Sequence, residues 1–311
     1  MNKKLITLAI AAAMTAPMAA MADATMFGKV RMAVESWDAD GGADHVKIQS
    51  YNSSLGVKGS EDLGGGLKAI YKLDFKVNIA NTTGEFSGSE PTIQSRNAYV
   101  GLGGDWGTLL VGRHDTPLKI STGSLDYFGD QAGDYNADQN GGFSDRRAND
   151  AIAYITPNMN GLTIAAAIVP GENNDADGIS DAYSVAAMYS NSGFFASAAY
   201  EAGSEDIDAI PAGAGDLEQM RFGLGFDGGN WKVSGVYENE ELTDLGDQDK
   251  YMVSAAMNFG NNTFKAKYFD SDDYVDGFAV GLDHNFSKRT QAYMVYVDSS
   301  YESGNDVTTW G

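Results

Sequence analysis

Cysteine is absent from the 311 residues, and proline occurs only six times. A chain without cysteine cannot be a small disulfide scaffold. The scarcity of proline stands beside 38 glycines, 16 tyrosines and 14 phenylalanines. Glycine and aromatic residues with little proline suit many strands joined by tight turns, and they argue against disordered low-complexity chain.

Basic residues are also scarce, with 21 Lys and Arg against 43 Asp and Glu, so the formal net charge is −22. Nucleic acid is therefore not an expected partner, because phosphate contacts need clustered Lys and Arg. The two signs are unevenly distributed. Residues 23–150 hold 12 basic and 18 acidic side chains, whereas residues 151–311 hold 7 basic and 25 acidic ones.

Catalytic and metal-binding motifs are poorly represented. The three histidines are scattered, and neither G-x-S-x-G nor H-E-x-x-H occurs. His284 and Ser287 lie three residues apart near a turn, which indicates surface polarity more than a hydrolase. The segment GENNDADGISDAY places Asp175 and Asp177 at calcium-loop spacing, but Ser184 stands where the twelfth ligand should be. We expect no enzyme and no cofactor, and only a weak calcium candidate.

The first 22 residues have the organisation of a secretory signal peptide. Lys3 and Lys4 precede an apolar run over 5–14, and Ala20-Met21-Ala22 forms an A-x-A cleavage site. The apolar run is too short for a spanning helix, which needs about 20 apolar residues. The sequence predicts an exported chain over residues 23–311.

Alternation of apolar and polar residues dominates the remainder, and no long helical period appears. In LKAIYKLDFKV, residues 67–77, Tyr71 and Phe75 lie on one face and Lys72 and Lys76 on the other. The same period recurs in MRFGLGFD and YMVSAAMNF. A soluble sandwich would need a second large apolar layer, which is not found. An apolar face opposite a polar one favours an all-β transmembrane antiparallel barrel with its apolar face toward lipid.

The connections between the strands alternate in length, as in an up-and-down meander. Short turns include GGDWG near 103 and DGGN near 227. The longer, acidic connections lie near 37–45, 78–92, 114–147, 170–181, 202–217, 240–249 and 271–276. Short turns at one end and long loops at the other are typical of outer-membrane barrels.

With these segments laid out, the sequence resembles the Gram-negative general porins, which are trimeric 16-stranded outer-membrane channels. The resemblance rests on MFGKVRMAVES, SSLGVKGSEDLGGGLKAIYKLDF, SRNAYVGLGGDWGTLLVGRHDTP, LDYFGD and NDAIAYITPNMNGLTIAAA. It implies a homotrimer in outer-membrane lipid that lets small hydrophilic solutes and ions diffuse passively. A substrate-specific channel for anions or organic acids is the alternative, and a non-channel adhesin is a more distant one.

The resemblance also implies that the third loop, at about 114–147, folds into the barrel and narrows it. A wet lumen can satisfy the backbone of such a segment; a surface loop of the same length is the alternative. In this family a ladder of basic residues on the wall faces acids on the inward loop. On the wall the candidates are Arg31, Lys58, Lys72, Lys76, Arg96, Arg113 and Arg147. On the loop they are Asp126 and Asp130, with Asp115 and Asp134 as weaker candidates.

Opposed charges across a narrow gap orient polar solutes and set an ion preference. The alternative is that inward charges merely hydrate the lumen. Arg96 is assigned to the inner face because Tyr99 has the opposite parity, and Tyr99 is expected to face lipid.

The C-terminus departs from the family pattern. We count about 15 strands, the last near 288–299, whereas single-chain bacterial barrels have an even number and this family has 16. The ending GNDVTTWG has the composition of an outer loop. The sequence therefore predicts that a final strand of about ten residues is missing.

Overall fold

The computed structural model describes residues 24–40, 44–80, 92–137, 142–171, 180–204, 215–304 and 306–311. The predicted signal peptide and the calcium candidates Asp175 and Asp177 lie outside these ranges. No helix in the described ranges is long and apolar enough to cross a membrane.

The described chain is almost entirely β-strand, with one short helix, α2 (Pro117–Thr122). The strands are β1 (Thr25–Lys29), β2 (Met32–Ala39), β3 (His45–Ser50), β4 (Ser54–Gly64), β5 (Leu67–Val77), β6 (Ile93–Gly104), β7 (Gly107–Asp115), β8 (Arg147–Ile155), β9 (Leu162–Val169), β10 (Ala182–Asn191), β11 (Phe194–Gly203), β12 (Leu217–Asp227), β13 (Trp231–Leu242), β14 (Gly246–Phe259), β15 (Asn262–Ser271), β16 (Val275–Asn285), β17 (Gln291–Tyr301) and β18 (Val307–Trp310).

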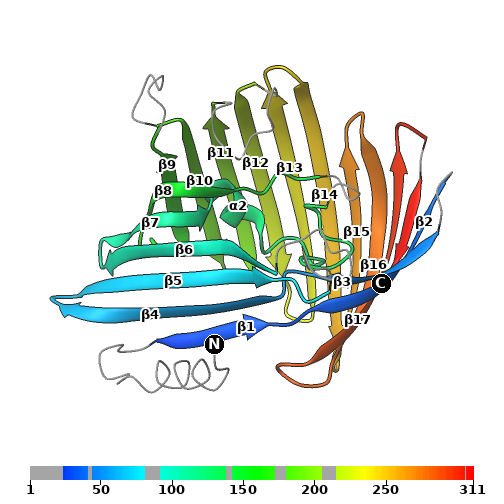
Figure 1. Ribbon diagram of the computed structural model, residues 1–311, viewed down its shortest axis with the longest axis horizontal. Coiled ribbons are helices and arrows are strands. Elements are labelled where there is room, and N and C mark those ends of the chain that lie inside the picture. Colours follow the sequence, from blue (N-terminus) through cyan, green and yellow to red (C-terminus); the bar gives the residue numbers. More distant parts are fainter. Residues whose placement is uncertain are drawn as a thin grey trace, which may run out of the picture.

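The 18 strands occupy sixteen positions around one antiparallel sheet. β1 and β2 are two halves of the first strand, and β3 and β4 are two halves of the second, because β1 pairs with β4 and β2 pairs with β3. Pairing then runs in chain order from β4 to β17 and returns through β18 to β2. In Figure 1, β4 to β7 run roughly horizontally and β11 to β16 roughly vertically, which reflects the strand tilt of a barrel. The predicted all-β, sixteen-stranded architecture is confirmed.

The two faces of the wall differ in chemistry as the alternation predicts. In β12, Phe222 and Leu224 are exposed on the outer face, whereas Arg221 is fully buried on the inner face. An apolar outer face and a polar inner face are what a barrel in lipid requires. Trp231 and Phe259 are exposed near strand ends, where interfacial aromatics belong.

Two connections predicted to be long are tight turns. β13 ends at Leu242 and β14 begins at Gly246, while β15 ends at Ser271 and β16 begins at Val275. The segments near 240–249 and 271–276 are acidic because these strands continue beyond the apolar belt while keeping their backbone pairing. Polarity alone therefore gave the wrong strand ends.

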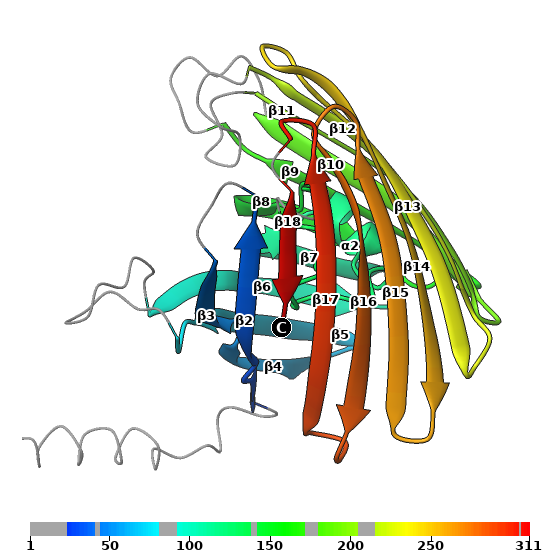
Figure 2. The ribbon, with the colours of Figure 1, turned by 90° about the vertical axis from the view of Figure 1, so that its right-hand side faces the viewer.

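The prediction that the C-terminus is an outer loop was also wrong. Val307–Trp310 forms β18, which pairs with β17 on one side and with β2 on the other (Figure 2). Four residues are too few to show an alternation, so only the two neighbouring strand edges define this strand. Beside Gly311 a groove of about 930 Å³ lies between β17 and β2, lined by residues such as Met32 and Met294.

A pair of cysteines tests the closure through β18. Ser36 and Trp310 are directly opposite in the β2–β18 register, so Ser36→Cys with Trp310→Cys should form a disulfide on oxidation. The chain has no other cysteine to interfere. The linked and free forms separate by gel mobility and by mass spectrometry of the joined peptides.

The control pair is Ser36→Cys with Thr308→Cys, which is two residues out of register. Such diagonal neighbours are about 7–8 Å apart, which is too far for an unstrained disulfide. A disulfide in the control but not in the test pair would mean that the register of β18 is different.

Candidate functional site

The segment after β7 lies against the inner face of the wall, on the side formed by β9 to β17 (Figure 1). The side chain of Thr116 caps helix α2 by accepting a hydrogen bond from the backbone N–H of Lys119 (3.3 Å). Pro117 is suited to the first turn because it has no N–H that would need an acceptor there. Leu118 is fully buried with Ala186 and Ala199 of the wall. The inner face therefore carries this segment as a second layer.

Apolar side chains fix the rest of the segment to the same wall. Leu125 and Phe143 pack with Met252 in one cluster, and Phe128 packs with Phe269 in another. The wall makes room for Leu125 with glycines, since a Cβ at Gly223 or Gly225 would lie 2.6 Å or 2.9 Å from it. These close approaches explain why two glycines follow Arg221 on the lumen face of β12.

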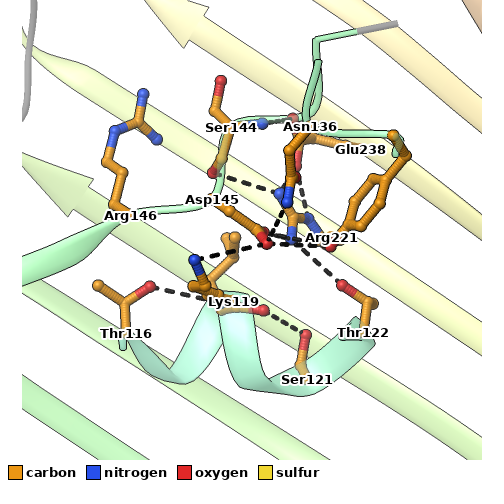
Figure 3. A network of polar contacts seen from close by, with 12 residues as sticks. Thr116, Lys119, Ser121, Thr122, Asn136, Ser144, Asp145, Arg146, Arg221 and Glu238 are labelled. Atoms are coloured by element: carbon orange, nitrogen blue, oxygen red, sulfur yellow. Dashed lines mark hydrogen bonds and ion pairs between the residues drawn. The ribbon is translucent and has the colours of Figure 1, made fainter. Parts of the chain in front are cut away.

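A buried arginine joins the segment to the wall by charge. The side chain of Arg221 is completely buried, and its guanidinium pairs with Glu238 of the next strand and with Asp145 of the segment (Nη1–Oδ1, 2.5 Å). The same group donates to the Thr122 hydroxyl (3.2 Å) and to the Ser144 carbonyl (3.3 Å). Figure 3 shows Arg221 between the helix and the segment's return to β8. One cation thus holds both ends of the segment.

Three lysines of β14 and β15 extend this attachment. Lys250 donates to the carbonyl of Gly142 (3.0 Å), and Lys265 donates to the side chain of Gln131 (2.7 Å). Lys267 pairs with Asp126 (3.6 Å) and is fully buried. Buried charges persist only when they are paired and hydrogen-bonded. Lys250 and Lys265 also pair with carboxylates of the wall, those of Glu238 and Asp283, so the segment completes their hydrogen bonding, whereas Lys267 takes its carboxylate partner from the segment itself.

Sequence reasoning missed these four anchoring cations. The available signal was their parity, because a Lys or Arg opposite bulky apolar residues in a barrel strand points inward. The alternation in MRFGLGFD puts Arg221 on the polar face but indicates no contact for it. Its partner Asp145 lies 76 residues away, and no local pattern links the two.

The basic wall lies on the other side, on β1, β2 and β4 to β8. Lys58 and Lys72 are cross-strand neighbours, and both ammonium groups lie over the ring of Phe27, at 5.6 Å and 5.5 Å. Phe27 therefore points inward and does not belong to an outer aromatic girdle. Lys76 shares this face, opposite Ser54 and Gln94.

Three arginines continue the wall. Arg147 pairs with Asp115 (Nε–Oδ1, 2.8 Å) and Arg96 with Asp74 (3.6 Å). Arg113 bonds to the side chain of Asn149. Arg96 and Arg113 are both near enough to act electrostatically on Arg147. The structure therefore brings the predicted arginines together.

The strand that carries Arg96 does not keep a strict alternation, so the expectation that Tyr99 faces lipid was wrong. The register between β5 and β6 shifts between Leu73 and Phe75, so β6 carries a bulge at Arg96 and Asn97. Because of the extra residue, Tyr99 also faces inward, where its ring lies 5.1 Å from His114. A bulge reverses alternation, and a strict period of two does not reveal it.

The four predicted acids divide into two pairs. Asp115 and Asp130 meet basic-wall residues, Asp130 through Lys29 and Arg31. The assignment of Asp115 to the loop was wrong, because it is the last residue of β7 and pairs with Arg147 of β8. Asp126 instead accepts from the backbone of Phe128 (3.0 Å) and Tyr135 (2.8 Å) and pairs with Lys267. The placement of Asp126 on the face toward the basic wall was wrong, because its carboxylate caps the segment's own turns.

Asp134 was also misplaced. Its carboxylate accepts from the backbone N–H groups of Asp130 (2.6 Å) and Asn136 (3.0 Å). Burial and the nearby Asp126 carboxylate raise its pKa to about 6, against the opposing effect of those hydrogen bonds and of Lys267. Burial would raise the pKa of Asp130 as well, but Lys29, Asn52 and Arg31 lower it below the ordinary value. Asp130 therefore carries the charge that faces the basic wall.

No set of three or more His, Cys, Asp and Glu in the described ranges could hold a metal ion. The histidines contact other groups: His284 lies against Asn262 (2.8 Å) and the ring of Phe286. The described residues thus place a charged wall opposite a docked segment.

Replacing Arg221 tests the attachment. Arg221→Met leaves Glu238 and Asp145 buried without this cation, so we expect the free energy of unfolding to fall by about 3–5 kcal/mol. Arg221→Lys keeps the charge and should lose less. Equilibrium unfolding in urea with the protein in detergent micelles measures both. Equal stability of the Met variant and the parent would show that this charge does not hold the segment.

Comparisons with known proteins identify the family and the fold. Residues 8–304 match the family model described as Gram-negative porin. The chain is 29% identical over 331 residues to major outer membrane protein P.IB of Neisseria gonorrhoeae, covering 94% of this chain and 92% of the relative. It is 30% identical over 315 residues to the P.IB protein of Neisseria meningitidis serogroup A, covering 94% and 91%.

Two solved structures have the same fold. An anion-selective porin from Comamonas acidovorans aligns with a TM-score of 0.75 at 24% identity, covering 92% of this chain and 97% of that one. The OmpF complex with daunomycin from Salmonella typhi aligns with a TM-score of 0.72 at 18% identity, covering 93% and 96%. The chain belongs to the Gram-negative porin family, whose members are passive channels of the outer membrane and not enzymes.

Proposed function

We propose that this passive channel is narrowest between the docked segment and the basic wall, and that it prefers anions there. The observation that carries the proposal is the direction of the charges. Arg96, Arg113 and Arg147 lie together on the wall, while Asp126 and Asp134 are turned away from it. The segment therefore offers few carboxylates to oppose the wall.

The balance of partners supports an excess of positive charge. Asp74 and Asp115 each pair with wall cations. Lys58 and Arg113 have no carboxylate at ion-pair distance in the described ranges, and the Nε of Arg113 is buried without a hydrogen-bond partner there. A half-exposed guanidinium without a carboxylate partner keeps its positive charge available to a passing anion.

The total charge of the chain opposes this preference. The formal net charge is −22, and many acids lie in the outer connections, where they attract cations to the mouth. Screening separates the two effects. The Debye length is about 10 Å at 0.1 M salt and about 3 Å at 1 M. Charges lining the narrow gap stay close to the ion at either salt concentration, so the anion preference should grow as salt rises.

Arg113→Gln tests the sign of selectivity. In planar bilayers under a KCl gradient, the parent should show a reversal potential on the chloride side at 1 M salt. The variant should shift that potential toward potassium, because an uncompensated cation is removed. Arg289→Gln, in the exposed turn before β17, is the matched control and should change nothing. A potassium-selective parent at 1 M would contradict the proposal.

A channel specific for organic anions is the second candidate. The cluster of three guanidiniums favours it, because carboxylates bind bidentately to such groups. The two candidates differ in liposome flux. A general channel passes small sugars and dicarboxylates at rates linear in concentration, whereas a specific one saturates with dicarboxylates at low concentration.

We also propose that the chain assembles as a homotrimer, with the outer face of β1 to β6 buried between copies. In the described part of this face every strongly exposed large apolar side chain is aliphatic, and Tyr71 and Phe75 are only half-exposed. Exposed aromatic residues begin at Trp106 and recur along the remaining strands. Interfacial aromatics mark a boundary with lipid and water, so their absence suits a face covered by protein.

A pair of tryptophan substitutions tests this interface. Leu55 on β4 and Leu224 on β12 are both exposed on the outer face. Leu55→Trp should weaken the oligomer, because a packed interface cannot accommodate the larger ring, whereas Leu224→Trp should be tolerated by lipid. Native gels and cross-linking in mild detergent measure the oligomer. Equal oligomer content in both variants would contradict the assignment of this face.

Outer-membrane location requires export, and we assign residues 1–22 that role as a cleaved signal peptide.

A further inference from the structure

We propose that the interruption shared by the first two strands is a cradle that positions the tip of the docked segment, with Asn52 and Ser53 as its positioning residues. The inference rests on the narrow gap proposed above and names what fixes its width. It concerns residues on the wall, outside the basic ladder and outside the buried anchors.

The cradle is built from an extra residue in the second strand. Glu35 is opposite Lys47 in the β2–β3 pair, and Lys29 is opposite Ser54 in the β1–β4 pair. Between these two positions the first strand advances by six residues and the second by seven, so the second strand contains one extra residue. Asn52 adopts a left-handed conformation with φ of 47°. Asparagine accepts this conformation more readily than most residues do.

Ser53 holds the interruption together. Its side chain is almost completely buried, and its hydroxyl accepts from the N–H of Arg31 (2.9 Å) and donates to the Arg31 carbonyl (3.1 Å). The Tyr51 N–H also donates to that carbonyl (3.1 Å). The backbone groups freed by the break are thus satisfied locally, which fixes the position of Arg31.

The cradle grips two residues at the tip of the segment. The Nη1 of Arg31 donates to the carbonyls of Gly129 (2.8 Å) and Asp130 (2.9 Å). The Asn52 amide donates to the Asp130 carboxylate (Nδ2–Oδ1, 2.6 Å), and Lys29 forms an ion pair with the same group. Asp130 is itself left-handed, with φ of 60°. The tip is therefore held on the side opposite its buried anchors.

Asn52 also connects the tip to the basic ladder. Its carbonyl accepts from Arg96 (Nη1–Oδ1, 2.8 Å) while its amide holds Asp130. The carboxylate of Asp130 in turn lies 3.4 Å from Arg31 and also pairs with Lys29, so it offsets one of the two positive charges on strand one. Release of the tip would widen the gap and expose Lys29 and Arg31 to passing ions. The cradle thus sets both the width and the charge of the passage.

Asn52→Gly tests the side-chain contacts of Asn52 separately from its backbone conformation. Glycine keeps the left-handed conformation and changes no charge, so any change in selectivity must come from movement of the tip. We expect higher single-channel conductance, more current noise and an anion-to-cation permeability ratio raised by a factor of about two to five, which is the effect of about one unit charge at contact distance in water.

Asp130→Asn should change conductance and selectivity in the same direction, and Asn52→Gly should add little in that background. Such non-additivity is the signature of two groups that act through one contact. Asn149→Gly is the matched control, because Asn149 bonds to Arg113 of the ladder and has no contact with the tip. It should leave the noise unchanged.

Planar-bilayer recording of the full chain under a KCl gradient measures conductance, noise and permeability ratio together, after circular dichroism has verified folding. If Asn52→Gly does not fold, Asn52→Asp carries the test by placing a second carboxylate against Asp130. A folded Asn52 variant indistinguishable from the parent overturns the cradle and leaves the channel proposal intact. A parent that forms no channel overturns both.

Discussion

Backbone pairing around the ring of strands is the constraint on which the rest of the structure depends. Lipid offers no hydrogen-bond partners, so every strand in the wall needs two neighbours. The ring of this chain passes through β18, which joins β17 to β2 over only four residues. Once the ring exists, its alternation divides the chain into an apolar outer face and a polar inner one, and all further chemistry takes place inside.

The inner face is used asymmetrically. On the side of β9 to β17, the cations Arg221, Lys250 and Lys267 are buried beneath the docked segment and contact it by ion pairs or hydrogen bonds. On the side of β4 to β8 the cations remain in the passage. The strands of both sides carry inward Lys and Arg, and the difference arises only from where the segment lies. The segment's position therefore distinguishes the two sides, because it buries one set of cations and leaves the other half-exposed.

The docked segment is held by two kinds of contact. Buried apolar groups and Arg221 attach it along its length, and losing one partner of such a buried pair is costly. At its tip, Asp130 meets partly exposed groups on strand one, where a single ion pair contributes little by itself. Several hydrogen bonds converging on Gly129 and Asp130 compensate for that weakness. The contrast separates a firmly anchored body from a tip whose position depends on local geometry.

The fold class and the strand alternation could be predicted from the sequence, because they follow from a period of two and from resemblance along the chain. Resemblance also predicts the inward loop and the basic wall. A strict period of two fails at features that it cannot express. The bulge at Arg96 turned Tyr99 inward, and acidic strand ends near residues 240–249 were mistaken for loops. Three features become visible only in the folded chain: which acids contact the wall, which cations are buried, and that Val307–Trp310 is a strand. Each of these depends on partners that are far apart in sequence, and local pattern carries no information about them.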